Sequence, residues 1–431
     1  MRQLLGSRSL ANRNGADHRA RRRVVGQLFS AAALRRYTPA ITQLVEALAA
    51  DLNGATQPVA LVERMRRFAF AVIASVVLGL EGDDSEALFA DFEIWTRALF
   101  SVPIALPGTP FDRALKARAR LLQRLRGVLE RAQERPTGGL DLLSGGLDEA
   151  GLPLTDDDLV EQLLLLLFAG YETTASSLSC LMAALLQHPA ELAWLQEEIH
   201  ALAWPLAEGA PTPRLSAVVQ EVMRLNPPVG GFFRRTTQPL ELAGVLVPAG
   251  QVVQVALAAS NRLARGGADD LDAFRPQRHL EPDNGLTLLP FGGGDRVCLG
   301  KALAELEIRL MAVGLLRQCR LQLLPDPGPQ PGADPQPQPA GWAAGGGGLR
   351  RNQPGSAWAS TVISAVSTLR TRSPRLTRWA ITASASCSSN GTKPPSGPII
   401  TTAGSGGASA SAVGAPMSAI QQGRPAHRPG S

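Results

Sequence analysis

A glycine-rich loop that carries one cysteine holds the residue types with the clearest chemistry in this sequence. The loop reads Phe291-Gly292-Gly293-Gly294-Asp295-Arg296-Val297-Cys298-Leu299-Gly300-Lys301. Glycines allow positive φ and let the backbone approach a flat ligand closely. The N–H groups at the start of the helix predicted to follow favour a thiolate at Cys298. Arg296, two residues away, is placed to bind a carboxylate through two hydrogen bonds.

A lone cysteine can also be an inert core thiol, and this is the interpretation for Cys180 and Cys319, which fall within predicted helices. For Cys298 the spacing favours a ligand, because the loop satisfies Phe-x-x-Gly-x-Arg-x-Cys-x-Gly throughout. By this pattern the sequence resembles the cytochrome P-450 superfamily. The resemblance implies haem b (iron protoporphyrin IX) with the Cys298 thiolate as its axial metal ligand, and Phe291 and Arg296 among its contacts. A thiolate ligand donates electron density to iron and favours O–O cleavage.

A second motif, Ala169-Gly170-Tyr171-Glu172-Thr173-Thr174, lies midway along a long apolar helix. Polar residues beside a glycine are locally unfavourable there, although satisfied hydroxyls alone would explain them. Beside Cys298 the motif resembles the family's Ala/Gly-Gly-x-Asp/Glu-Thr-Thr signature. The resemblance implies that the helix opens over the haem, and that Glu172 and Thr173 form the acid–alcohol pair that relays protons there.

Haem propionates need cationic partners. His18 and Arg22 are four residues apart and hence on one helical face, and the family's first haem-contacting helix carries a similar His-x-x-x-Arg. The alternative is a solvated basic run, which is the interpretation for the neighbours Arg19, Arg21 and Arg23. By resemblance to a strand of the family, Arg234 is preferred to Arg235 as a further propionate partner, and Arg296 is the fourth.

Glu221-Val222-Met223-Arg224 places opposite charges three residues apart on one helix. Alone, Glu-x-x-Arg is usually a solvated pair. Together with Arg278 downstream, it resembles the family's Glu–Arg–Arg network, which supports the cysteine loop and does no chemistry.

The elements that must position these residues are mainly helical, with a minor β part. The predicted order is helices from Asp17 to about Arg135 with breaks at Gly54, Gly82–Asp84 and Pro103–Pro110, a long helix from Thr155 or Asp156 to about Gln187, helices Pro189 to about Trp204 and Pro213–Leu225, a hairpin pairing Leu240–Val247 with Gln251–Leu257, and a last helix Leu299–Gln318. The resemblance implies the cytochrome P-450 fold, with haem between the long central helix and the cysteine loop with its last helix.

Both ends depart from the family pattern. Residues 1–325 are expected to form the haem domain, incomplete at the N-terminus, with the family's N-terminal β-sheet region largely missing. Residues 326–431 are a Pro/Gly/Ser/Ala-rich tail that is expected to be disordered, because it cannot bury enough apolar surface. We therefore expect the chain to retain haem binding even where the missing parts impair catalytic turnover.

Composition excludes several classes of protein. The net charge is +6, but the tail from Asp326 holds nine basic and two acidic residues. The body is thus close to neutral, which argues against nucleic-acid binding. Four cysteines form no disulfide scaffold, and the longest apolar run, Leu163–Gly170, is too short to span a membrane. We expect a soluble, cytoplasmic protein.

Three passages, Arg224–Arg234, Leu289–Gly294 and Cys298–Lys301, look like the retinoic-acid hydroxylases of animals and their bacterial relatives. The resemblance implies a monooxygenase that inserts one oxygen atom from O2 into a C–H bond of a hydrophobic substrate, such as a retinoid or another isoprenoid. Phe232 and Phe233 are candidates to line its pocket, or to pack in the core.

Electrons would come from a separate ferredoxin- or flavodoxin-type donor, since no flavin or nicotinamide motif follows the haem region. Lys301 and Arg309 either face that donor or are ordinary solvated charges. Two other classes stay open, a haem-binding protein with degenerate or no catalysis and a peroxide-using haem enzyme. The pair Glu172-Thr173 favours the monooxygenase over both.

Overall fold

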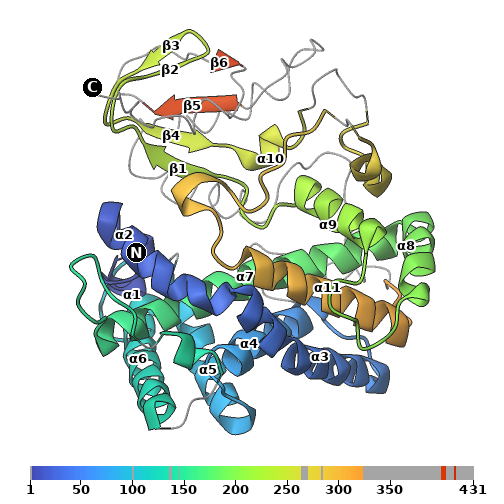
Figure 1. Cartoon of the computed structure of the whole chain (residues 1–431), viewed down its shortest axis with the longest axis horizontal. Helices are drawn as coiled ribbons and strands as arrows, with labels where there is room; N and C mark the ends of the chain where they lie inside the picture. Colours follow the sequence, from blue (N-terminus) through green and yellow to red (C-terminus); the bar gives the residue numbers. More distant parts are fainter. Residues whose placement is uncertain are drawn as a thin grey trace, which may run out of the picture. The chain divides into compact units, whose positions relative to one another are not determined.

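A computed structural model describes residues 2–99, 101–134, 138–143, 145–263, 270–282, 285–323, 399–403 and 412–413. The chain forms two compact units (Figure 1). The first comprises Met1–Thr212 with Cys298–Gly348, and the second Pro213–Val297 with Leu349–Ser431. Helices dominate and strands are few, which confirms the predicted class.

The described elements of the first unit are all helical: α1 (Arg2–Leu5), η1 (Leu10–Asn12), α2 (Gly15–Gly26), η2 (Gln27–Phe29), α3 (Ala31–Gly54), α4 (Leu61–Val76), α5 (Gly82–Arg97), α6 (Pro110–Glu134), η3 (Leu140–Leu143), α7 (Asp156–Gln187), α8 (Pro189–Ala201) and α11 (Lys301–Gln318). Those of the second unit are α9 (Pro213–Leu225), β1 (Phe232–Arg235), β2 (Leu240–Leu242), β3 (Val245–Val247), β4 (Val252–Val255), α10 (Leu257–Ser260), η4 (Pro276–Leu280), η5 (Gly294–Arg296), β5 (Ile399–Ala403) and β6 (Ala412–Val413).

The long helix α7 has the predicted bounds, for reasons visible in its sequence. The Thr155 side chain accepts a hydrogen bond from the Asp158 N–H, and three aspartates fill the first turn. The helix ends before His188-Pro189, because the residue preceding proline disfavours helix. It packs against α4, α6, α8 and α11 and so forms the centre of the first unit (Figure 1).

By length and apolar composition α7 passes as a membrane span, which the sequence analysis did not expect of any segment. It is the single such helix in the described part of the chain, and 56% of its most apolar stretch is buried inside the protein. Burial of that extent is what a central core helix shows.

An aromatic cluster locks α7 against α4 and α5. Tyr171 lies edge-on to Phe70, Phe89 and Phe92, with ring centroids 5.0 to 6.4 Å apart. Edge-to-face aromatic pairs add roughly 0.5–1.5 kcal/mol each beyond burial. Because Tyr171 precedes Glu172, this cluster also fixes the rotation of the helix at the second motif.

The β part differs from the prediction. Segment Leu240–Val247 was predicted as one strand, but it turns at Ala243-Gly244, both with positive φ, and pairs with itself as the β2–β3 hairpin. The predicted partner strand instead becomes β4 and pairs antiparallel with β1 in the register Phe232↔Val255 to Arg235↔Val252. The predicted pairing was therefore wrong, since a two-residue turn closed sooner than expected.

Two short strands lie within the predicted low-complexity tail. β5 pairs with β4 in the register Val252↔Ala403 to Val255↔Ile400, and β6 pairs with β5. Composition did not predict these strands. The rest of residues 326–431 lies outside the described residues, and the proposed domain division at 325 stays a prediction.

A buried charge cluster joins α9 to η4 in the second unit. Glu221 accepts hydrogen bonds from Arg224 (2.7 and 2.9 Å) and from Arg278 (3.0 Å), as predicted. His279 Nε2 lies 2.7 Å from Oε2 of Glu221, and the Arg275 N–H donates to Oε1 of the same carboxylate at 2.9 Å. Burial alone would raise the pKa of Glu221, but these bonds lower it to about 2.

We predict that Glu221→Gln removes a pH-dependent part of the stability. The folded pKa of about 2 lies below the ordinary value of 4.5, so the carboxylate stabilises the fold above pH 4.5 and loses this effect as pH falls toward 2. The difference corresponds to roughly 3 kcal/mol at neutral pH. Urea unfolding at pH 7 and pH 3 measures most of it, with the exposed Glu241→Gln as control. Equal pH dependence in both variants would contradict the prediction.

Candidate functional site

Cys298 lies two residues before Gly300, the N-cap of α11, which begins at Lys301. Among the described cysteines it is the exposed one, whereas Cys180 and Cys319 are buried, as predicted. Burial raises the pKa of Cys180 to about 11. The Cys319 thiol is directed at the Ala49 carbonyl at 3.7 Å. Of these three sulfurs, that of Cys298 is therefore the one placed to bind an external partner.

The electrostatic surroundings of Cys298 pull in two directions. Desolvation raises the pKa of the thiol even though part of the residue is exposed, while the Gly300 N–H and the Arg22 guanidinium lower it. The Gly300 N–H at the start of α11 acts toward thiolate, as expected, but desolvation outweighs it and the pKa of the thiol is raised. A metal cation at the sulfur changes this balance, because a coordinating thiol is deprotonated.

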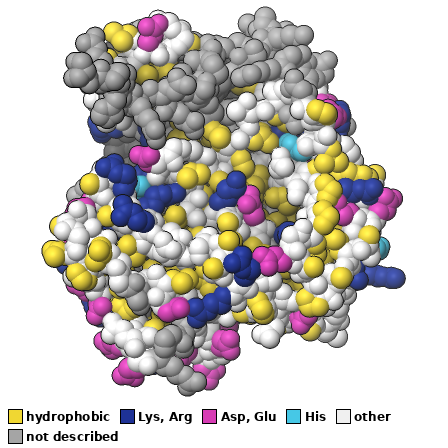
Figure 2. Space-filling model, in the orientation of Figure 1, with side chains coloured by type: hydrophobic (Ala, Val, Ile, Leu, Met, Phe, Trp, Pro, Cys, Tyr) yellow, Lys and Arg dark blue, Asp and Glu magenta, His cyan; other side chains and the backbone are white. Residues whose placement is uncertain are grey.

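The predicted pair on α2 lies one turn apart, with His18 buried and Arg22 half-buried. Since the charge of Arg22 acts on the Cys298 sulfur, α2 and the cysteine are neighbours within the first unit. Arg19 and Arg23 are exposed, as expected of solvated charges. Figure 2 shows dark-blue side chains gathered over α2. This face is therefore suited to an anionic group held beside the sulfur.

Arg21 was predicted to be solvated, and this was wrong. It is 5% exposed and donates to Asp158 at 3.1 Å, to Glu149 at 2.7 Å, and to Asp17. The physical reason is that three aspartates at the start of α7 need cationic partners, which α2 supplies. Arg21 thus ties the helix carrying His18 and Arg22 to the central helix.

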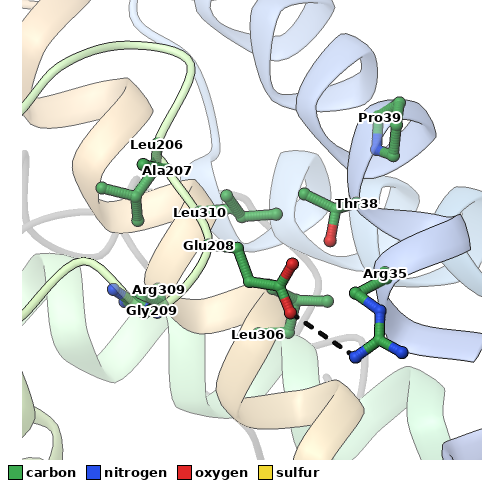
Figure 3. A pocket seen from close by; sticks show the side chains of 10 residues that line it. All are labelled: Arg35, Thr38, Pro39, Leu206, Ala207, Glu208, Gly209, Leu306, Arg309 and Leu310. Carbon is green, nitrogen blue, oxygen red and sulfur yellow. Dashed lines mark ion pairs between the residues drawn. The ribbon is translucent and has the colours of Figure 1, made fainter. Parts of the chain in front are cut away.

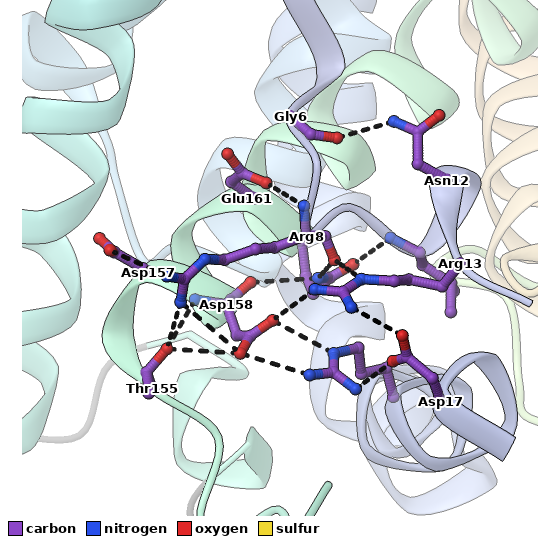
Figure 4. Close-up of polar contacts among 12 residues, drawn as sticks. Gly6, Arg8, Asn12, Arg13, Asp17, Thr155, Asp157, Asp158 and Glu161 are labelled. Carbon is purple, nitrogen blue, oxygen red and sulfur yellow. Dashed lines mark hydrogen bonds and ion pairs between the residues drawn. The ribbon is translucent and has the colours of Figure 1, made fainter. Parts of the chain in front are cut away.

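The segment before α2 joins the same network (Figure 4). Arg13 bridges Asp17 at 2.6 Å and Asp158 at 3.7 Å, and Arg8 donates to Thr155 at 3.0 Å. The carboxylates of Asp17 and Asp158 are each shared among several guanidinium groups. The start of α7 and the segment before α2 therefore form one ion network. This network sets the position of α2.

The second motif lies on a face of α7 that is not fully buried. Ala169 is exposed, and Glu172 and Thr173 are half-buried, whereas Thr174 is buried. α7 stays helical throughout, so the opening implied by the resemblance is no break in the helix. The Thr173 hydroxyl instead donates to the Ala169 carbonyl at 2.6 Å. The hydroxyl oxygen can therefore still accept a hydrogen bond from a donor.

Glu172 has a partner that the sequence analysis missed. Arg66 of α4 binds its carboxylate through two hydrogen bonds of 2.9 and 3.2 Å. Close approach of the two helices depends on Gly170, because a Cβ there would lie 3.1 Å from Ile73. The one sequence signal for Arg66 was an arginine three residues after Glu63 in a largely apolar helix.

The other predicted residues belong to the second unit. Arg234 lies in β1 with its guanidinium 4.2 Å above the Phe232 ring, and it donates to the Phe233 carbonyl at 2.9 Å. Arg235 donates to the Gly250 carbonyl at 2.7 Å. Phe232 is thus covered by Arg234, while Phe233 is 58% exposed.

Phe291 and Arg296 are half-buried at the two ends of the glycine run. Gly292 and Gly294 have φ of +71° and +66°, and no atom lies within 4 Å of a Cβ built at Gly292, Gly293 or Gly294. The expectation of positive φ is confirmed, and open space beside the loop is what a flat ligand needs.

Comparison with known proteins decides the family. The family model for cytochrome P-450 matches residues 2–340. The chain belongs to the cytochrome P-450 family. Like other cytochromes P-450, it is a monooxygenase that binds haem b through a cysteine thiolate.

Two curated relatives illustrate the similarity. The chain is 35% identical to the cytochrome P-450 120 protein of Synechocystis sp. over 356 residues, 78% of each protein. It is 33% identical to cytochrome P-450 26B1 of Danio rerio over 345 residues, 74% of this chain and 67% of that protein.

Solved structures agree with this membership. The retinoic acid-bound cyanobacterial CYP120A1 is 34% identical, with a TM-score of 0.67 over 73% of this chain and 74% of that one. CYP109E1 from Bacillus megaterium in complex with corticosterone, at 24% identity and a TM-score of 0.59, supports the cytochrome P-450 fold alone. The predicted fold is confirmed.

The residues present fit a haem group. An accessible thiol lies beside a guanidinium in the first unit, and a glycine run with open space precedes that thiol in the sequence. A thiolate and arginines are the donor types that haem iron and propionates require.

We predict that Arg21→Met destabilises the first unit. Loss of the guanidinium leaves Asp158, which is 7% exposed, with fewer cationic partners, and breaking a buried ion pair costs roughly 3–5 kcal/mol. Chemical denaturation of the haem-loaded protein measures this loss. Arg23→Met, an exposed position on the same helix, is the matched control. A loss no larger than that of the control would show that the network is dispensable.

Proposed function

We propose that this cytochrome P-450 hydroxylates a retinoid or a similarly elongated isoprenoid, with Cys298 as the haem ligand. The observation that carries the assignment of Cys298 is its accessible sulfur beside the Arg22 charge. Similarity to CYP120A1, solved with retinoic acid bound, supports the substrate class.

We assign the haem contacts as follows. Arg22 and His18 bind propionate oxygens from α2, and the ion network around Arg21 holds that helix in place. By resemblance, Arg234 and Arg296 bind propionates as well, and Phe291 packs on the porphyrin. The haem, when bound, supplies the activation of dioxygen.

Proton supply is the part played by the chain's own side chains on α7. The Thr173 hydroxyl hydrogen is held by the Ala169 carbonyl, so its oxygen accepts a hydrogen bond from water. Glu172, half-buried and anchored by Arg66, holds a carboxylate one residue away. The pair can pass a proton through water from the protein surface toward the substrate site.

The substrate and the electron donor follow from the remaining surfaces. Large apolar side chains at Val102, Ile104 and Leu106 are exposed between α5 and α6, as suits capture of a hydrophobic substrate.

A separate ferredoxin- or flavodoxin-type protein supplies electrons. Lys301, whose pair with Glu305 is exposed and 3.8 Å long, is a suitable docking charge. The protein works in the cytoplasm as a soluble enzyme.

We predict that Cys298→Ser abolishes the thiolate spectrum. Reduction under carbon monoxide should give the wild-type protein a Soret band at the position typical of thiolate-ligated haem, and the variant should lose it, because a serine oxygen does not replace the sulfur. Cys180→Ala, a buried cysteine, is the control and should keep the band. An unchanged spectrum in the Cys298 variant would overturn the assignment.

We predict that Thr173→Ala uncouples electron use from product. Product per electron consumed should fall about tenfold or more, since positioned proton-transfer groups contribute roughly 10²–10⁴-fold. Thr173→Ser keeps the hydroxyl and should restore most of the coupling. The measurement is product against consumed reductant with retinoic acid as substrate; equal coupling in the Ala and Ser variants would exclude a role for the hydroxyl.

A further inference from the structure

A hollow of about 210 Å³ lies between α3, α11 and the segment that joins α8 to α9 (Figure 3). Two residues that line it, Arg35 and Glu208, form an ion pair of 3.6 Å. Arg309 donates to the Ala210 carbonyl, and burial lowers the pKa of its guanidinium. Arg309 is therefore withdrawn from the charges that could face an electron donor, and the hollow does not point to a ligand.

The loop between α5 and α6 carries a more informative surface, an uninterrupted run of exposed apolar residues. Every residue from Val102 to Pro107, in the order Val-Pro-Ile-Ala-Leu-Pro, is exposed. Val102, Ile104 and Leu106 are 69%, 49% and 62% exposed, and Ile94 near the end of α5 is exposed as well. Apolar residues scattered singly over a surface are ordinary, but a contiguous exposed run marks a surface that a partner covers.

Hydrogen bonds hold this apolar loop in a fixed shape. The Thr109 hydroxyl donates to the carbonyls of Ile104 and Leu106, at 2.6 and 2.8 Å. The carboxylate of Asp112 accepts a hydrogen bond from the Gly108 N–H at 3.1 Å. The two prolines of the run have no N–H to satisfy. Because much of the backbone at the tip is bonded within the loop, the loop is suited to a medium that offers few hydrogen-bond partners.

Cations surround the base of the loop, and they are more exposed than the acids paired with them. Arg97 pairs with Glu93 at 3.4 Å, and their side chains are 73% and 30% exposed. Lys116 pairs with Asp112 at 2.9 Å, and their side chains are 64% and 16% exposed. Arg113 is exposed on the same side of α6 as Lys116. The surface around the apolar loop is therefore positive toward solvent.

The same pattern continues along α6, which packs against α5 (Figure 1). Arg120 and Arg124 follow Lys116 at spacings of four residues, so the three cations lie on one face of the helix. Both arginines are exposed, whereas Asp91, the carboxylate that they share, is buried. α6 thus presents a row of cations that begins beside the apolar loop.

We propose that this loop docks the protein reversibly on the surface of an anionic lipid bilayer. The apolar side chains of the loop enter the boundary between headgroups and acyl chains, and the cations Arg97, Arg113 and Lys116 contact lipid phosphates. A bilayer offers an apolar medium with a layer of negative charge directly above it, whereas an apolar protein surface offers only the first. The docking does not depend on the proposed function, although it brings the protein to the phase in which a hydrophobic substrate dissolves.

The test is co-sedimentation of the haem-loaded full chain with vesicles of phosphatidylcholine and phosphatidylglycerol in equal parts, and with vesicles of phosphatidylcholine alone. Binding should be at least about tenfold tighter to the anionic vesicles and should weaken as salt is raised. Ile104→Ser combined with Leu106→Ser should lower the affinity at least about tenfold, because two apolar side chains no longer leave water. Leu147→Ser combined with Leu152→Ser changes two leucines of matching exposure elsewhere in the first unit and should leave binding unchanged.

The contribution of charge is measured with a second matched pair of variants. Arg113→Gln should weaken binding to the anionic vesicles about fivefold and leave binding to the neutral vesicles unchanged. Arg131→Gln removes an exposed cation near the other end of α6 and should bind as the wild-type protein does.

Several results would overturn the proposal. One is a wild-type protein that does not bind the anionic vesicles. Another is a loop variant that binds as tightly as its leucine control, which is expected if the basic tail from Asp326 alone attracts the lipid. A third is a dimer in sedimentation velocity without lipid that the loop variant dissociates, since the partner would then be a second copy of the chain. Loss of the thiolate spectrum or of retinoid turnover bears only on the proposed function, because none of these measurements uses catalysis.

Discussion

The sulfur of Cys298, the proposed haem ligand, must be accessible and yet bear a negative charge, and contacts within the first unit bear on both requirements. Burial around Cys298 opposes ionisation, and the chain offers two compensations, the Gly300 N–H and the Arg22 guanidinium. The first comes from the start of α11. The second depends on α2, whose place is set by ion pairs with the start of α7. The central helix therefore influences the sulfur through a chain of charges.

Both units use buried charge for the same purpose, to fix the relative position of segments far apart in sequence. In the first unit Arg21 is hydrogen-bonded to Asp158, which lies 137 positions further along the chain. In the second, Glu221 gathers Arg224, Arg278 and His279. Hydrogen-bonded charges have narrow geometric requirements, so they specify a single arrangement where apolar contacts alone would allow sliding.

The sequence predicted what short spacing encodes. The positive φ of Gly292 and Gly294, the bounds of α7 and the Glu221–Arg224 pair each depend on a local pattern, and the structure agrees with these three predictions. The role of Arg21 was missed because its partners Glu149 and Asp158 lie more than a hundred residues away. Arg66 was missed for the same reason. The β2–β3 turn was local, but Ala243-Gly244 is a weaker turn signal than the Pro248-Ala249-Gly250 that follows it, and β5 pairs across about 150 residues of sequence.

Gly170 has a consequence for the relay that its own lack of chemistry conceals. It sets how near α4 comes to α7, because any side chain at that position meets Ile73. The Arg66–Glu172 ion pair spans the same two helices. With a hydrogen in place of a methyl group, Gly170 lets α4 and α7 lie close together where Arg66 reaches Glu172, and a side chain added there would press on Ile73 between them.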